Sequence, residues 1–185
     1  MSRFLFIACV IASAVVLLGA PEATAQVQHE TSDITGQERV SSTGLRDADV
    51  QNYAGDDIAY KAEYVYQPET TEESWRLTFY GFTDQRTGMT QTDRALVWID
   101  GQRRRISEVT ARARRIDDGV LEIQTATMSA STFRRIATGE TVQFTIGSAE
   151  FDLLYEDRAD MRAVLEEANE IASPGTQRQR ADNGN

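Results

Sequence analysis

Cysteine is nearly absent from this chain, because Cys9 is the only one among its 185 residues. It lies inside an apolar N-terminal run, so whatever fold follows that run must hold together without disulfide bonds. A Cys–His nucleophile and a zinc site built on cysteine both lack their parts. The core of the protein therefore has to come from hydrophobic packing alone.

Histidine is equally scarce, since His29 is the only one. We expect it in a polar segment without regular structure, whereas a general base must be held beside its target. The sequence also contains no Gly-x-Gly-x-x-Gly motif, no phosphate-binding loop and no Asp-x-Asp-x-Asp-Gly calcium loop. We therefore expect no cofactor, no metal ion and no catalytic residue, and an enzyme is the less favoured interpretation.

Lysine is also rare, because all but one of the 19 basic residues are arginine. The chain has 29 acidic residues and a formal net charge of −10. A protein of this charge is soluble and repels nucleic acids and anionic membranes. We expect no nucleic-acid partner.

No apolar run is long enough to span a bilayer. The longest, Phe4 to Leu18, is shorter than the roughly 20 residues that a spanning helix needs. Arg3 precedes it and the small-x-small pattern Ala23-Thr24-Ala25 follows it, which is the order of a cleavable signal peptide. We expect residues 1–25 to be removed after Ala25, leaving a secreted or periplasmic protein with no stable membrane insertion.

Three further regions follow the predicted signal peptide. Residues 26–55 are polar and without periodicity, which predicts a mobile leader. Residues 56–173 carry the hydrophobic patterns of a single domain, and the polar residues 174–185 predict a disordered tail.

The domain alternates apolar and polar residues with a period of two, which is typical of half-buried strands. The Asp100-Gly101 and Gly147-Ser148 dipeptides predict tight hairpin turns. Ser129 predicts the cap of a short helix that ends at Gly139, and spacings of three and four predict a C-terminal amphipathic helix that ends before Pro174. The expected strands span residues 58–67, 75–80, 95–99, 103–116, 120–128, 142–146 and 149–155.

These patterns predict an α+β domain. About seven strands form a curved antiparallel sheet, joined by hairpins, and the C-terminal helix packs on it. Tyr60, Tyr64 and Tyr66 fall on one strand face, which favours a core position over a ligand cleft. We expect a bulge in the strand 103–116, because the apolar Ile106 and Ile116 fall on the same side as Arg112. We expect Leu121 and Ile123 to point inward.

Arginine is concentrated in the middle of the chain, from Arg94 to Arg135. Guanidinium groups bind carboxylates and phosphates in a bidentate geometry, so an exposed strip could hold an acidic protein or an acidic polysaccharide. The alternative is a solvated sheet face on which the arginines pair with Glu108, Glu122 and their neighbours. The candidate ligand-binding residues are Arg103, Arg105, Arg112 and Arg114.

The leading functional hypothesis is therefore an exported, non-catalytic binding or assembly module of the cell envelope or exterior. The alternative is a glycoside hydrolase that uses two carboxylates, which would have to lie roughly 5–10 Å apart across a cleft. Turn and capping chemistry explains many of the acidic pairs equally well. These pairs are Asp56 with Asp57, Glu72 with Glu73, Asp117 with Asp118, Glu150 with Asp152, and Glu156 with Asp157.

Overall fold

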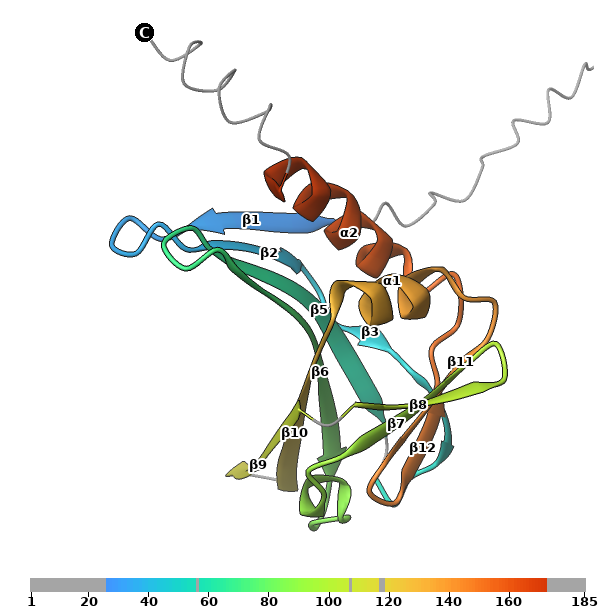
Figure 1. The fold of residues 1–185 in the computed structure, drawn as a ribbon. Helices are drawn as coiled ribbons and strands as arrows, with labels where there is room; N and C mark the ends of the chain where they lie inside the picture. Colours follow the sequence, from blue (N-terminus) through green and yellow to red (C-terminus); the bar gives the residue numbers. More distant parts are fainter. Residues whose placement is uncertain (1–25, 56, 107, 117–118, 173–185) are drawn as a thin grey trace, which may run out of the picture.

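This computed structural model describes residues 26–55, 57–106, 108–116 and 119–172. Within them the chain forms two antiparallel β-sheets and two α-helices (Figure 1). The predicted α+β class, with antiparallel strands and a C-terminal helix packed on a sheet, is confirmed. The predicted signal peptide, the C-terminal tail and the Asp117-Asp118 turn lie outside the described residues.

The strands divide into a seven-stranded and a five-stranded sheet, where a single sheet was expected. The larger sheet runs in the order β1 (Val27–Thr31), β2 (Glu38–Ser42), β5 (Ile58–Gln67), β6 (Glu72–Thr83), β10 (Gly119–Met128) and β9 (Glu108–Ile116), with β3 (Arg46–Asp47) paired to β5. The smaller sheet runs in the order β4 (Asp49–Asn52), β12 (Ala149–Asp152), β11 (Val142–Ile146), β7 (Ala95–Ile99) and β8 (Gln102–Ile106).

The prediction of an unstructured leader over residues 26–55 is wrong, because this segment forms β1, β2, β3 and β4. Strands β1 and β2 pair with each other, and β2 also pairs with β5. Val40 on β2 is fully buried. The polar composition misled the prediction because these short strands obtain their apolar contacts from the rest of the fold. Helix α2 (Ala159–Ala172) lies against β1 and β2 (Figure 1).

The long strand expected over residues 103–116 is also wrong. Its first part is β8 in the five-stranded sheet, and its second part is β9 in the seven-stranded sheet. Ile106 is buried at the end of β8, whereas the even-numbered Arg112 on β9 is exposed. The change of parity that predicted a bulge therefore reflects the passage of the chain from one sheet to the other.

On β10, the inward and outward residues are the reverse of the prediction. Glu122 and Gln124 are fully buried, whereas Leu121 and Ile123 lie on the outer face and are only partly buried. The segment between β6 and β7 accounts for this, because it covers the inner face of β10 with hydrogen-bonding groups. The Gln124 amide donates to the carbonyls of Met89 (3.0 Å) and Thr92 (2.9 Å).

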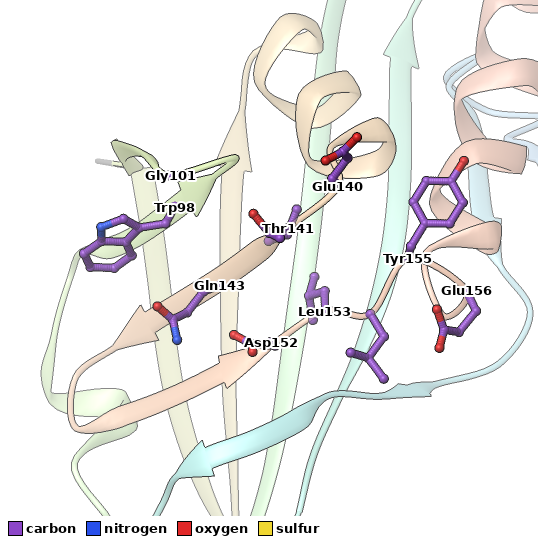
Figure 2. A pocket seen from close by; sticks show the side chains of 11 residues that line it. Trp98, Gly101, Glu140, Thr141, Gln143, Asp152, Leu153, Tyr155 and Glu156 are labelled. Atoms are coloured by element: carbon purple, nitrogen blue, oxygen red, sulfur yellow. The ribbon is translucent and has the colours of Figure 1, made fainter.

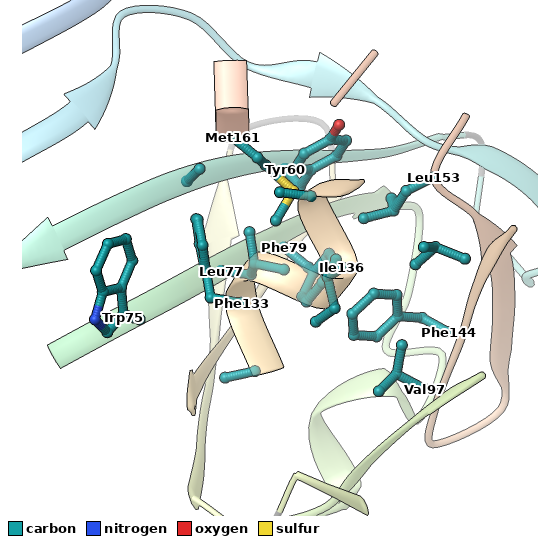
Figure 3. Close-up of a cluster of buried hydrophobic side chains, with 14 of the residues drawn as sticks. Tyr60, Trp75, Leu77, Phe79, Val97, Phe133, Ile136, Phe144, Leu153 and Met161 are labelled. Atoms are coloured by element: carbon teal, nitrogen blue, oxygen red, sulfur yellow. The ribbon is translucent and has the colours of Figure 1, made fainter. Parts of the chain in front are cut away.

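The core lies between the two sheets and beneath the helices (Figure 3). Phe79 on the larger sheet packs against Phe144 and Phe151 on the smaller one, with ring centroids 5.1 and 5.2 Å apart. The predicted core position of the tyrosines is confirmed for Tyr60 and Tyr64, which are almost completely buried. This aromatic packing holds the sheets together, and the described residues contain no cysteine that could add a disulfide.

Both predicted helices are present. Helix α1 (Ala130–Thr138) begins at Ser129, whose hydroxyl accepts a hydrogen bond from the Thr132 N–H. Helix α2 buries Met161, Val164, Leu165, Ala168 and Ile171, as its periodicity predicted. No helix among the described residues is both long enough and apolar enough to cross a membrane.

Candidate functional site

The structure places the four candidate arginines as two separate pairs. Arg103 and Arg105 are exposed on β8, opposite Trp98 and Leu96 of β7. Arg112 and Arg114 are exposed on β9, opposite Ile123 and Leu121 of β10. The pairs therefore lie on different sheets, and the sequence did not indicate this separation.

The alternative in which these arginines pair with nearby acids is not what the structure shows. None of the four forms an ion pair among the described residues. Glu122, one of the expected partners, points into the core instead. All four guanidinium groups are therefore available to an external carboxylate, phosphate or sulfate.

Arg103 and Arg105 belong to an ordered arrangement on the outer face of the five-stranded sheet. Val97, Phe144 and Phe151 point into the core, so their neighbours along the strands point outward. Cross-strand pairing aligns these outward residues in two rows. One row is Arg103, Trp98, Gln143, Asp152 and Asp49, and the other is Arg105, Leu96, Thr145, Glu150 and Asn52.

The Arg103–Trp98 contact gives one end of the first row a defined geometry. The Arg103 guanidinium carbon lies 5.7 Å from the centroid of the Trp98 ring, a cation–π arrangement. Because the indole is itself partly buried on β7, it limits the positions that the Arg103 side chain can adopt. This contact presents the guanidinium beside the polar groups of the same row.

An open depression of about 540 Å³ lies at one end of this face, where β7 and β12 end and β11 begins (Figure 2). Trp98 and Gln143 stand on one side, and the exposed side chain of Tyr155 stands on the other. Asp152 lies between them. The depression combines apolar surfaces with a few polar groups, the pattern that small-molecule and cofactor sites share.

Three acidic residues line this depression, and a carboxylate-based hydrolase would have to draw its two carboxylates from such a set. Of the carboxylates considered from the sequence, Asp152 and Glu156 line it, and Glu140 joins them. Burial raises the pKa of Asp152 above its ordinary value, and the neighbouring charge of Asp49 raises it further. One oxygen of Asp152, Oδ1, is inaccessible to solvent and has no hydrogen-bond partner among the described residues.

Asp49 and Asp152 face each other directly across β4 and β12. Like charges in this position are destabilising, and cross-strand pairs contribute about 0.2–1 kcal/mol. A carboxyl whose pKa is raised by folding favours the folded state while it is protonated, so stability decreases as the pH rises through that pKa.

We expect Asp152→Asn to stabilise the protein by about 0.2–1 kcal/mol at pH 7, because it removes one of two opposed charges. The gain should vanish near pH 3, where Asp152 of the wild type is already protonated. Urea unfolding at both pH values measures the difference. Equal stability of variant and wild type at pH 7 would show that the two charges do not repel each other appreciably.

Comparison with family models, curated proteins and solved structures found no match for this chain.

His29 is held in place, contrary to the expectation of a mobile position. It lies on β1 with Nε2 3.5 Å from Glu38 Oε2 and Nδ1 3.5 Å from Glu167 Oε1. Its neighbours connect β1, β2 and α2, so its contacts serve the packing of that helix. Among the described residues, no group of three or more His, Cys, Asp or Glu side chains could hold a metal ion.

Two buried charged residues were missed by the sequence analysis. Arg158 is fully buried and donates to backbone carbonyls, and Glu122 is a fully buried carboxylate. Asp160, in the first turn of α2, is also buried and accepts a bidentate hydrogen bond from Arg46 at 2.7 and 2.8 Å. No local sequence signal distinguishes these residues from the many exposed charges. Their contacts stabilise the fold that supports the outer face of the five-stranded sheet.

Proposed function

We propose that this chain is an exported, non-catalytic binding module that holds an acidic polysaccharide across the outer face of its five-stranded sheet. The observation that carries the proposal is the row of Arg103, Trp98, Gln143 and Asp152, aligned on four adjacent strands, in which Arg103 has no ion pair within the described part of the chain. The N-terminal sequence up to Ala25 supports export.

The chemistry of the row suits a sugar that carries carboxylates. The guanidiniums of Arg103 and Arg105 fit carboxylate groups in a bidentate geometry. Gln143 can donate and accept hydrogen bonds, and Asp152 can accept them from sugar hydroxyls. Trp98 and Tyr155 offer apolar surfaces with polar tips beside these groups.

The size of the row also suits a chain-like ligand. Neighbouring strands lie about 4.8 Å apart, so the three intervals from β8 to β12 span about 14 Å. The depression is open rather than enclosed, so a polymer can lie across it without threading through a tunnel. The net charge of −10 opposes the approach of a polyanion, so binding depends on the local guanidiniums and should weaken with salt.

The test is isothermal titration calorimetry with polygalacturonate, using uncharged dextran as the control polymer. We expect binding of polygalacturonate alone. Arg103→Ser with Arg105→Ser should weaken it about tenfold, and at most about thirtyfold, because each of the two exposed ion pairs contributes up to about 1 kcal/mol and 1.4 kcal/mol is a factor of ten. Trp98→Ala should also weaken it. The matched control is Arg112→Ser with Arg114→Ser on the other sheet. This double variant should leave the intrinsic affinity of each chain for polygalacturonate unchanged.

Three outcomes would count against the proposal. Equal losses from both arginine pairs would indicate nonspecific electrostatic attraction. Stronger binding of polyglutamate than of polygalacturonate would favour an acidic protein as partner. Release of reducing ends from the polysaccharide, lost in an Asp152→Asn variant, would instead support the carboxylate-based hydrolase.

A further inference from the structure

Strand β9 forms a long free edge of the seven-stranded sheet. It pairs with β10 along its whole length of nine residues without a register shift, and no strand lies on its other side in the described part of the chain. The opposite edge, β1, lies next to α2 through the contact between His29 and Glu167. The edges of the smaller sheet are shorter, with four residues in β4 and five in β8.

A long, regular edge strand offers unpaired N–H and C=O groups to another strand. Charged side chains often prevent such pairing, and β9 carries three arginines. It also carries Glu108 at its start, on the same outer face as Arg112 and Arg114. The charge pattern is therefore acidic at one end of the strand and basic at the other.

We propose that β9 pairs antiparallel with β9 of a second copy of this chain, with Ala111 on the two-fold axis. In an antiparallel pair, residues at equal distances on either side of the axis face each other. Glu108 then faces Arg114 of the second copy, and the same contact occurs twice. Thr110 faces Arg112, Val109 faces Ala113, and no arginine faces another arginine.

The alternative registers are poorer for reasons of charge or length. An axis at Arg112 places the two Arg112 side chains opposite each other, and an axis at Ala113 places Arg112 opposite Arg114 twice. An axis at Thr110 also pairs Glu108 with an arginine, but it uses only residues 108–112 of β9, whereas the axis at Ala111 uses residues 108–114. A two-fold axis that passes between two residues is excluded, because the outer face of β9 in one copy would then continue into the inner face of β9 in the second copy.

The inner face of β9 permits this approach. Val109 is partly buried against the core, and the next residues on that face, Ala111 and Ala113, have small side chains. These small side chains leave space for a second strand along the edge of β9. A second copy fits better than an unrelated chain, because one strand supplies both charges of each ion pair in the order that self-pairing requires.

Charge reversal tests the ion pairs by sedimentation equilibrium. We expect reversible dimers of the wild type, with the dimer dissociation constant raised at least tenfold in Glu108→Arg and in Arg114→Glu. The double variant should recover dimerisation, and so should an equimolar mixture of the two single variants, since every pair then joins opposite charges. The control Arg105→Glu, on β8 of the other sheet, should dimerise like the wild type.

Cross-linking tests the register in a Cys9→Ser background, where an introduced thiol is the only one. Ala111→Cys should form an intermolecular disulfide on mild oxidation, because directly opposed Cα atoms lie about 4.5–5.5 Å apart, within disulfide range. Ala113→Cys should not, because Ala113 faces Val109 of the second copy. A monomeric wild type, a folded double variant that fails to recover dimerisation, or equal cross-linking of both cysteine variants would overturn the proposal.

Discussion

Replacing Arg158 with alanine is expected to destabilise the protein by about 3–5 kcal/mol. The side chain is fully buried and donates to the carbonyls of Gly139 (2.9 Å), Leu154 (3.2 Å) and Glu140 (3.4 Å), and also to that of Ile136. Each buried carbonyl left without a donor costs about 1–3 kcal/mol. The loss of the large side chain adds a cavity.

These contacts explain why a guanidinium is needed. The carbonyls of Ile136, Gly139 and Glu140 belong to the end of α1 and the residues after it, where a helix leaves its last carbonyls unpaired. One planar group with five N–H donors reaches several of them at once, and its positive charge favours the negative end of the helix dipole. Burial lowers the pKa of Arg158, yet arginine starts so high that it stays charged.

Urea unfolding of Arg158→Ala, with Arg162→Ala as the matched control, measures this prediction. Arg162 lies in α2, one turn after Arg158. It is partly exposed and donates to the carbonyls of Ala137 (3.3 Å) and Tyr155 (2.9 Å). Water can replace much of that contact, so we expect a loss of about 1 kcal/mol. If the two variants lost the same stability, the burial of Arg158 would have no special role in closing the end of α1.

Local patterns predicted what depends on local chemistry. Asp100 and Gly101 adopt the positive φ values of a tight turn, 52° and 74°, and Ser129 caps α1 as expected. The buried stripe of α2 follows from its periodicity. Strands and helices were predicted correctly where the residues of a single segment determine by themselves which face of that segment is apolar.

Contacts between distant segments determined what the sequence did not reveal. The period-two pattern of β10 suggests that Leu121 and Ile123 are buried, whereas distant groups, above all those of the segment between β6 and β7, make the inward position of Glu122 and Gln124 favourable. The same limit applies to the site. The predicted turns already place Arg103 opposite Trp98 and Gln143 opposite Asp152, but nothing local placed these two hairpins side by side in one row.

Glu122 is the clearest case of a residue whose role depends on a distant loop. Its carboxylate is fully buried and accepts hydrogen bonds from the Thr90 hydroxyl (2.8 Å), the Thr87 N–H (3.3 Å), the Thr87 hydroxyl and the Tyr53 hydroxyl (3.4 Å). Burial acts to raise the pKa of Glu122, but the hydrogen bonds from Thr87 and Thr90 outweigh it and lower the pKa overall. The carboxylate therefore remains charged and holds the segment between β6 and β7 against the sheet.

We expect Glu122→Leu to lose about 2–4 kcal/mol at pH 7, because it leaves the Thr87 N–H and two threonine hydroxyls without an acceptor. The pH dependence has a definite sign. Because folding lowers the pKa of Glu122, its stabilising effect is present above the unfolded pKa and is lost as the pH falls through the lower folded pKa. Part of the acid destabilisation of the wild type should therefore disappear in Glu122→Gln, which cannot titrate.

Urea unfolding from pH 7 down to pH 3 separates these effects, with Glu150→Gln as the matched control. Glu150 is exposed on β12 and has no ion pair among the described residues, so its replacement should change stability by less than about 0.5 kcal/mol. Hydrogen exchange at the Thr87 and Met89 amides adds a local measurement, since both should exchange faster in Glu122→Leu. If stability and exchange in that variant matched the wild type, the segment between β6 and β7 would be held by its other contacts. Gln124, whose amide donates to the carbonyls of Met89 and Thr92, would then be the residue to replace.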